Sequence, residues 1–528
     1  METEAQVDSI IEAHLRELSR PGVVSVRPGF RMQNAWITDE RAIVVTVDSG
    51  ADAAASGLPS ELDGVPLDIR TASPAKIAQL SAIAVGRATA DALPSAPDQG
   101  GVPTFANERV LAPERTAFIP GEQADLQKRP TKERLAYTAP AGVALVPVTG
   151  QVSLEVSASP DAGWPLLSGF LAGTDRSLTI GLYDFTSAHV LAGFETAARD
   201  KTVALVLDHP PKNPTADQTD DETVAALKDA LGARFDQVWA LERADPHAAA
   251  WIYPSAYHIK VAVRDSGSIW LSSGNWNNSN QPDIDPVHNP ADAAEARTRD
   301  RDWHVVIHHE ELAKTFEEYL ENDHAIAAKH QVAPAASALL EAALLAQPAA
   351  QTPPFQHFTA AEKIQETMTI TPVLTPDPGV YAQAVRSLIE SATASLHLQF
   401  QYIEPPSSPT PASAGFSALI DAVVARQNAG VEVRIIMSQY ETAGYLEQLQ
   451  QSGLDVVHNV KLQNNVHNKG MVVDGSRTLV SSQNWSTAGT LENRDAGVII
   501  DSSRVAAYFD AIFQHDWDNL AAQHARED

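Results

Sequence analysis

The sequence predicts an α/β protein in which two related lobes follow a small N-terminal α+β domain. The chain has 528 residues, too many for one hydrophobic core, since domains usually run to roughly one or two hundred residues. Helical and strand-like segments alternate from Trp164 to Asp323 and again after residue 373, as they do in α/β units. The second unit also repeats sequence features of the first, which indicates a duplicated domain.

The repeated features lie far apart in the chain. The stretch R-S-L-T-I at 176–180 is echoed by A-S-L-H-L at 394–398, and Y-H-I-K at 257–260 by V-H-N-K at 466–469. These pairs are separated by 394 − 176 = 218 and 466 − 257 = 209 positions. Solenoid repeats have much shorter periods, so the pattern indicates two lobes instead of a repeat array. A third matching pair is Arg301-Asp302 and Arg494-Asp495.

Composition and pattern divide the chain into five predicted segments. The first contains a helical face with Val7 and Ile11 and a β-rich run at 42–47, and it offers no catalytic constellation, so we expect a structural or docking role. The stretch 277–299 is acidic and turn-rich, which predicts a surface loop or lid. The segments are a small α+β domain (1–90), a linker with strands (91–155), lobe 1 (156–328), an Ala/Pro-rich connector (329–372) and lobe 2 (373–528).

The composition limits the possible functions. The formal charge is 38 − 67 = −29, which disfavours a nucleic-acid partner and strong docking on anionic membranes, because an acidic surface repels phosphates. The absence of cysteine excludes disulfides, thiolate metal sites and cysteine nucleophiles. The N-terminus has no signal-like pattern, and the chain has no stretch of about 20 apolar residues. We therefore predict a cytoplasmic protein without a transmembrane segment.

A motif with the spacing H-x-K-x-x-x-x-D occurs once in each unit. Each copy is followed by a related tail, S-S-G-N-W or S-S-Q-N-W. A single histidine on a strand usually has a structural role, but two matches at corresponding repeat positions indicate a functional site. The first copy consists of His258, Lys260 and Asp265 with the tail 272–276, and the second of His467, Lys469 and Asp474 with the tail 481–485.

The spacing within each motif suits a phosphodiester substrate. Side chains alternate faces along a strand, so the histidine and lysine of one motif point the same way. If the lobes pack about a pseudo-twofold axis, two imidazoles and two ammonium groups converge. The lysines would neutralise phosphate oxygens as negative charge builds in the transition state. One neutral histidine could attack phosphorus while the other, protonated, donates to the leaving oxygen, since histidine's free pKa is about 6.5.

The doubled motif resembles the paired HKD signatures of the phospholipase D superfamily, over roughly residues 160–528. The resemblance implies two phospholipase D-like α/β/α lobes with the active site at their junction. It also implies a reaction through a covalent phosphohistidine, without a metal or other cofactor. His258 would be the nucleophile and His467 the general acid and later the base, or the reverse. The family tail usually begins G-S, whereas Ser272 and Ser481 stand in place of the glycine here.

The resemblance assigns roles to further residues. Asp302 and Asp495 match the acidic residues that orient the catalytic histidines. In lipases of the family this partner lies across the lobes, which would pair Asp495 with His258 and Asp302 with His467. The residues given a structural role are Asp265 and Asp474, and those expected to line the phosphate site are Ser273, Asn275, Ser482 and Asn484.

The leading functional prediction is phospholipase D-type hydrolysis of a glycerophospholipid, such as phosphatidylcholine, to phosphatidic acid and an alcohol. A covalent phosphoenzyme would also permit transphosphatidylation when an alcohol replaces water. The alternative is a nuclease of the same superfamily, whose chemistry is identical, although the charge favours lipid over nucleic acid. A third alternative is an inactive binding scaffold, against which the two intact motifs argue. The sequence predicts no metal site, because no histidine cluster has ligand spacing, and it makes no prediction about oligomeric state.

Overall fold

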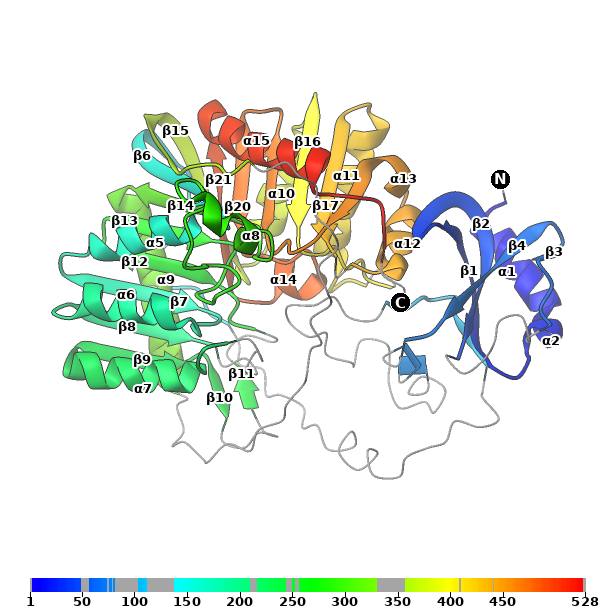
Figure 1. Cartoon of the computed structure of the whole chain (residues 1–528), viewed down its shortest axis with the longest axis horizontal. Coiled ribbons are helices and arrows are strands. Elements are labelled where there is room, and N and C mark those ends of the chain that lie inside the picture. The colour runs from blue at the N-terminus through cyan, green and yellow to red at the C-terminus, as the bar shows by residue number, and fades with distance from the viewer. Residues whose placement is uncertain are drawn as a thin grey trace.

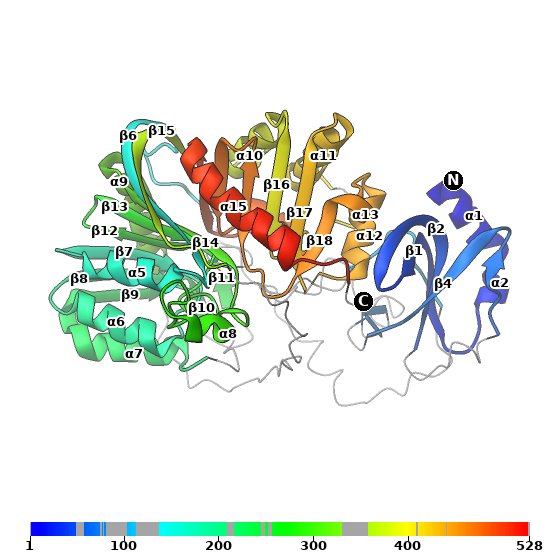
Figure 2. The same cartoon turned by 45° about the horizontal axis from the view of Figure 1, so that its top comes forward.

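The computed structural model shows two lobes and a small N-terminal domain. Figure 1 and Figure 2 show the three parts in a row, with lobe 2 between lobe 1 and the N-terminal domain. The described residues are 2–48, 57–73, 76–77, 79–80, 103–111, 137–208, 216–243, 249–251, 256–329, 357–407, 410–439 and 441–525.

The two lobes share one 14-stranded sheet. In lobe 1 the strand order is β6 (Val148–Ser159), β14 (Asp302–His308), β13 (Ser268–Ser272), β12 (Lys260–Arg264), β7 (Ser177–Leu182), β8 (Thr202–Leu207) and β9 (Phe235–Trp239). In lobe 2 it is β15 (Glu362–Thr375), β21 (Asp495–Asp501), β20 (Arg477–Ser481), β19 (Lys469–Val473), β16 (Ser395–Phe400), β17 (Glu432–Ser438) and β18 (Val460–Gln463). The strands β6 and β15 pair antiparallel at the centre, and the order outward from them is the same in both directions. The topology confirms the predicted pair of related α/β lobes.

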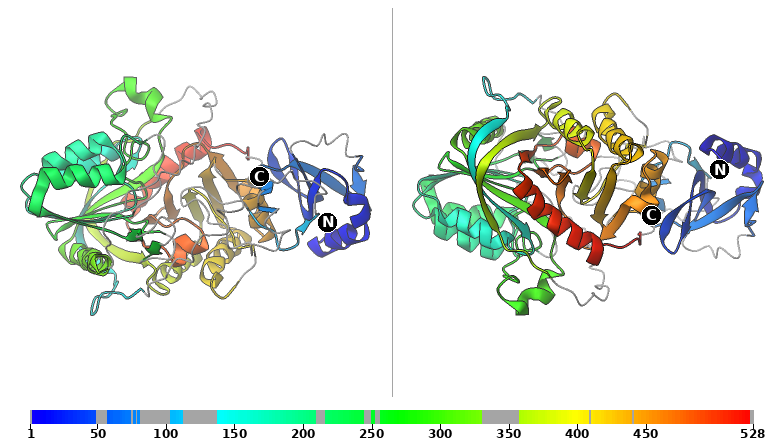
Figure 3. Two further views of the ribbon diagram at one scale, coloured as in Figure 1. Left: turned by 90° about the horizontal axis from the view of Figure 1, so that it is seen from below. Right: turned by 90° about the horizontal axis from the view of Figure 1, so that it is seen from above.

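Helices cover both faces of the sheet in each lobe (Figure 3). The long helices α9 (Glu310–Ala328) and α15 (Ser503–Asn519) bury apolar residues spaced three or four positions apart, such as Leu312 and Phe316 in α9. Both helices belong to one hydrophobic cluster with strands of both lobes, and Phe509 of α15 stacks on Trp303 of β14 at 4.5 Å. The lobes therefore share a core.

The remaining elements of the lobes are shorter. In lobe 1 they are α5 (Gly163–Ala172), α6 (Ala188–Ala198), α7 (Asp220–Leu231), the 3-10 helices η2 (Gly232–Arg234) and η3 (Pro290–Asp292), α8 (Ala293–Ala296), and a separate pair of strands, β10 (Leu241–Arg243) and β11 (Ala249–Trp251). In lobe 2 they are α10 (Val380–Glu390), α11 (Ala414–Asn428), α12 (Ala443–Gln451), α13 (Val456–Asn459) and α14 (Thr487–Leu491).

Two buried arginines link the lobes through ion pairs. Arg301 of lobe 1 lies 2.7 Å from Asp161 of its own lobe and 2.9 Å from Asp516 of lobe 2. The same arrangement occurs with the lobes exchanged. Arg494 of lobe 2 lies 3.3 Å from Asp377 of its own lobe and 2.7 Å from Asp323 of lobe 1. We call these two sets of contacts the arginine clamps.

The N-terminal domain packs against lobe 2. Its sheet has the order β3 (Glu61–Leu62), β4 (Val65–Thr71), β2 (Trp36–Val47), β1 (Val23–Gln33) and β5 (Arg109–Val110), and its helices are α1 (Glu4–Ala13) and α2 (Leu15–Leu18). The β1–β2 hairpin places Phe30, Trp36 and Ile37 in the apolar cluster of lobe 2. Since these residues share a core with lobe 2, the hairpin is the apolar part of the contact.

A buried carboxylate forms the polar part of that contact. Glu447 of α12 accepts hydrogen bonds from Arg27 (2.7 Å), Arg70 (2.9 Å) and the backbone N–H of Phe30 (2.6 Å). Burial alone would raise the pKa of Glu447, but the two guanidinium groups outweigh it and lower the pKa to about 2. The carboxylate is therefore ionised and paired at neutral pH.

The observed strands cross the boundaries expected from composition. Strand β6 begins at Val148 and β5 at Arg109, both inside the predicted linker 91–155, and β15 begins at Glu362, inside the predicted connector. The first half of β15 alternates buried and exposed positions, so its charged residues dilute the apolar signal that a sequence offers. The predicted loop 277–299 contains the short helices η3 and α8.

Candidate active site

The two motif copies lie at equivalent places in the two lobes. Lys260 is the first residue of β12 and Lys469 is the first residue of β19. His258 and His467 have relative exposures of 1% and 6%, and both lysines are fully buried. A buried charged group needs partners to offset its lost hydration, so the contacts of these four side chains define the site.

Backbone contacts bring each histidine to a carboxylate of the other lobe. The residue before His258 forms a parallel β-bridge with the residue before Asp495. The residue before His467 forms the same bridge with the residue before Asp302. As a result, Nδ1 of His258 donates to Asp495 at 2.9 Å, and Nδ1 of His467 donates to Asp302 at 3.0 Å. Both pairs cross between the lobes, and they are the pairs that the resemblance implied.

The two tail serines contact these carboxylates. Ser273 donates to Oδ1 of Asp302 at 2.7 Å, and Ser482 donates to Oδ1 of Asp495 at 2.6 Å. Each hydroxyl also accepts the backbone N–H of the residue after the aspartate. A serine hydroxyl has a single proton to donate, so neither serine has one left for a phosphate oxygen in this arrangement. The serines thus fix the aspartates, and their expected role at the phosphate stays a prediction.

The two lysines have different contacts. Lys469 Nζ lies 2.9 Å from Nε2 of His467, whereas Lys260 donates to the backbone carbonyl of His258 at 2.6 Å. An ammonium group cannot accept a hydrogen bond, so His467 accepts at Nε2 and is neutral, with its proton on Nδ1. The Tyr183 ring lies against the His258 ring, with 4.9 Å between centroids.

The two tail asparagines are buried beside these groups. Their relative exposures are 2% for Asn275 and 3% for Asn484. Oδ1 of Asn275 has no hydrogen-bond partner among the described residues. A buried amide oxygen of this kind normally pairs with a donor, and Asn275 therefore keeps capacity for a contact with a bound molecule.

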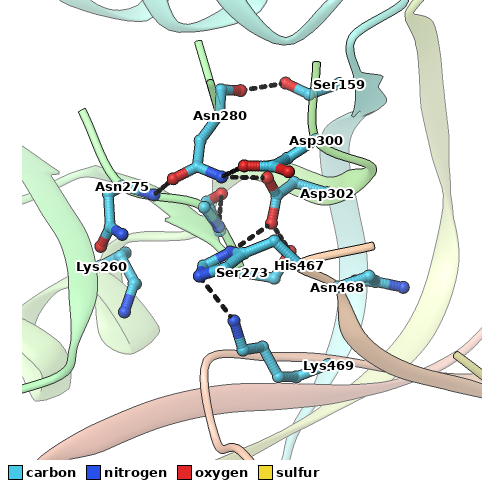
Figure 4. A network of polar contacts seen from close by, with 12 residues as sticks. Ser159, Lys260, Ser273, Asn275, Asn280, Asp300, Asp302, His467, Asn468 and Lys469 are labelled. Carbon is cyan, nitrogen blue, oxygen red and sulfur yellow. Dashed lines mark hydrogen bonds and ion pairs between the residues drawn. The ribbon is translucent and has the colours of Figure 1, made fainter. Parts of the chain in front are cut away.

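A second carboxylate lies behind Asp302. Asn280 donates from its amide nitrogen to Asp302 at 2.8 Å and to Asp300 at 3.0 Å (Figure 4). Burial raises the pKa of Asp300 to about 6. Burial would also raise the pKa of Asp302, but the facing His467 outweighs it and lowers the pKa to about 2. Asp302 is therefore ionised at neutral pH, while the pKa of Asp300 lies close to neutral pH.

The motif aspartates lie at the far ends of β12 and β19, five residues beyond the motif lysines, or roughly 16 Å along the strand at about 3.3 Å per residue. Asp265 accepts three backbone N–H groups from 175–177, and Asp474 accepts three from 393–395. Their φ angles of +54° and +49° place both in left-handed turn positions, which aspartate tolerates. These contacts tie each turn to the start of β7 or β16.

Sequence reasoning assigned no role to Asn280, Asp300 or the arginine clamps. A signal for the clamps was present, since S-P-D at 159–161 and T-P-D at 375–377 are repeated, as is the arginine before each site aspartate. Asn280 and Asp300 lie in the loop after the first tail, and Asn493 stands where Asp300 would recur. A repeat comparison therefore could not find them.

Within the part of the chain that the structure describes, no group of three or more His, Cys, Asp or Glu side chains is arranged to hold a metal ion. None of the helices in these described ranges combines the length and apolar character that crossing a bilayer requires.

Comparison with known proteins gives the following matches. Residues 385–517 match the family model described as the phospholipase D-like domain of cardiolipin synthase. Similar solved structures include phosphatidylserine synthase from Haemophilus influenzae Rd KW20, with 13% identity, a TM-score of 0.46, and coverage of 70% of this chain and 88% of that chain. They also include the phospholipase D family member Nuc from Salmonella typhimurium, with 20% identity, a TM-score of 0.24, and coverage of 30% and 98%. No curated protein matches the sequence.

The matched region contains the complete second motif, and the duplication relates lobe 1 to it. The fold and the repeated motif are those expected of a phospholipase D-like protein with one half-site in each lobe. The match therefore places residues 385–517 in the phospholipase D-like domain family.

Proposed function

We propose that the protein is a metal-independent phosphodiesterase that acts through a covalent phosphohistidine, in a phospholipase D-type reaction on a glycerophospholipid. The observation that carries this proposal is the pair of imidazoles held by carboxylates of opposite lobes, at 2.9 Å for His258 and 3.0 Å for His467. A carboxylate at Nδ1 fixes the tautomer and stabilises the imidazolium. Nε2 is then the reacting atom of each ring.

In the first step, Nε2 of His258 attacks phosphorus, and the bond from phosphorus to the leaving oxygen breaks. His467, protonated at Nε2, transfers that proton to the leaving oxygen, so the alcohol departs neutral. Lys260 and Lys469 stabilise the non-bridging oxygens. Phosphate binding draws Lys469 away from the position 2.9 Å from Nε2 of His467, which lets this nitrogen carry the proton.

In the second step, His467 accepts a proton from water while the water oxygen attacks phosphorus. The bond between phosphorus and His258 breaks, and the imidazole returns to its neutral form. With a glycerophospholipid the product is phosphatidic acid. An alcohol in place of water would give a new diester, and the family model matched by lobe 2 takes its name from a synthase. Both acceptors therefore belong in the experiment.

A lipid substrate is supported by charge as well as by the matched family. The formal charge of −29 opposes the approach of a polyanion. A zwitterionic phospholipid carries no net charge to repel, and its phosphodiester presents the same reacting group as a nucleic acid.

The test is choline release from dispersed phosphatidylcholine in excess chelator, measured beside nicking of plasmid DNA. Choline release that survives the chelator, with a phosphoryl adduct on His258 found by mass spectrometry after an alkaline quench, supports the proposal. DNA nicking without choline release would move the substrate class to nucleic acids and leave the chemistry in place. Loss of all activity on chelation, or full activity in His258→Ala, would contradict the mechanism.

A further inference from the structure

We infer that Asn280 and Asp300 are positioning residues that make the two half-sites chemically different, by holding the Asp302 carboxylate and favouring the protonated form of His467. This inference rests on the proposed function and deepens it, because it assigns the acid and base role to one half-site from that half-site's own contacts.

The orientation of the Asn280 amide is fixed by its neighbours (Figure 4). Oδ1 of Asn280 accepts the backbone N–H of Asn275 at 3.0 Å. Its amide nitrogen must therefore face the carboxylates, where it donates to Asp302 at 2.8 Å and to Asp300 at 3.0 Å. The backbone carbonyl of Asn280 accepts a hydrogen bond from Ser159 at 2.5 Å. Because both the oxygen and the nitrogen of this amide are hydrogen-bonded, the amide keeps the two carboxylates at a fixed distance from each other.

The single difference between the two motif tails provides the space for this amide. The tails read S-S-G-N-W and S-S-Q-N-W, with Gly274 in lobe 1 where lobe 2 has Gln483. A Cβ atom at Gly274 would lie 2.7 Å from Oδ2 of Asp302 and 2.9 Å from Cβ of Asn280. Such distances are too short for non-bonded atoms, so a side chain at this position excludes Asn280 from its place beside Asp302.

Lobe 2 lacks this arrangement. Oδ2 of Asp495 has no hydrogen-bond partner among the described residues. The residue that corresponds to Asp300 is Asn493, which is uncharged. Each histidine thus contacts a carboxylate that a serine supports. The two half-sites differ in the negative charge behind that carboxylate.

Several elements contribute charge around His467. Burial lowers the pKa of His304 to about 4, so this histidine is neutral near pH 7. Asp300 ionises above about pH 6 and then adds a second negative charge. A nearby opposite charge raises the pKa of a histidine, typically by about one unit or more. The charged groups labelled around this site in Figure 4 are Asp302 on β14, Asp300 before it, Lys469 on β19 and Lys260 on β12. His304 on β14 also acts on Asp302.

The test removes the second charge and follows the pH dependence of turnover. Asp300→Asn keeps the shape of the side chain, and it should move the alkaline limb of the pH–rate profile down by about one pH unit. The matched control is Asp283→Asn, which makes the same change on an exposed carboxylate of the same loop and should leave the limb in place. A purely structural defect would lower the rate at every pH without moving the limb.

Two further variants test the amide itself. Asn280→Ala removes the bridge, and Gly274→Ala displaces it without altering any polar group. Both should move the alkaline limb in the same direction as Asp300→Asn, with about a tenfold loss of kcat. A thermal melt of each variant shows that the fold is intact.

A measurement without turnover separates this inference from the proposed function. The imidazole of His467 can be titrated by NMR in histidine-labelled protein, with its signal identified by its absence in His467→Gln. The wild type should titrate at higher pH than Asp300→Asn. An unchanged titration and an unchanged alkaline limb in Asp300→Asn overturn the inference alone. A wild type that cleaves no phosphodiester overturns the proposed function, and the NMR titration still decides the inference.

Discussion

The two lobes are built from the same strands in the same order, yet the polar contacts of their described residues differ. In lobe 1, Asn280 and Asp300 stand behind the carboxylate of the active site. In lobe 2, Glu447 holds the N-terminal domain through Arg27 and Arg70. The contacts at the junction are matched in both halves, whereas the residues around them differ. Duplication thus supplies the paired reacting groups, and single-copy residues supply the difference between them.

The largest expected effect is the loss of kcat on replacing either histidine. The loss should depend on the leaving group of the substrate for one histidine and not for the other. His258→Gln should lose at least about 10³-fold in kcat on every substrate, because no other group can form the covalent intermediate. His467→Gln should lose about 10²- to 10⁴-fold on a lipid, but far less on a p-nitrophenyl phosphodiester, whose leaving group departs as a stable anion. Steady-state assays on both substrates measure this. Equal losses in all four combinations would remove the distinction between the half-sites.

The arginine clamps should contribute equally to stability, because they are matched. Arg301→Met or Arg494→Met leaves two buried carboxylates without their cation, which should cost about 3–5 kcal/mol in the free energy of unfolding. Urea denaturation measures the change. The control is Arg386→Met, which breaks an exposed pair with Glu390 and should cost less than about 1 kcal/mol. A clearly smaller loss in one clamp than in the other would show that the halves are not equivalent there.

The network specific to lobe 2 should appear as a pH dependence of stability. The two guanidinium groups outweigh burial and hold the pKa of Glu447 at about 2 in the folded protein, against its ordinary value of 4.5. A lowered folded pKa means that the stabilisation is present above about pH 4.5 and is lost as the pH falls towards 2. It amounts to about 3 kcal/mol at neutral pH. Unfolding at several pH values checks this, and Glu447→Gln should flatten the dependence while leaving phosphodiesterase activity unchanged.

The smallest effect compares the two serines that hold the site carboxylates. Ser482→Ala should lower kcat about tenfold, because Asp495 then loses its serine and has no amide partner at Oδ2. Ser273→Ala should cost only about threefold, since Asn280 still holds Asp302. The double variant of Ser273 and Asn280 should lose more kcat than either single variant. Identical losses for the two single serine variants would contradict the proposed difference in support.

The sequence was sufficient for the parts of the molecule that occur twice. The repeated motif predicted the two related lobes. The expectation that the histidine and lysine of each motif share a strand is wrong, because β12 and β19 begin at the lysines and the histidines precede them. The direction of the Ser273 and Ser482 hydroxyls could not be predicted, because it depends on where the following strand sets its carboxylate. Asn280 and Asp300 could not be found by comparing the repeats, since their network is present in one lobe. The start of β15 was missed because its first half alternates buried and exposed positions and carries polar and charged residues.

The arginine clamps have a consequence for how the protein can be divided. Each clamp takes one carboxylate from either lobe, and the central strands β6 and β15 pair only with each other across the boundary. A fragment containing one lobe would expose the edge of β6 or β15. It would also contain charged side chains of the clamps without their oppositely charged partners. Each fragment alone would lack half of the site and would have no activity. When the two fragments are mixed, any recovered activity should increase with the product of their concentrations, because both are needed for one complete site. Two intact chains that exchanged lobes would instead assemble two complete sites from four halves.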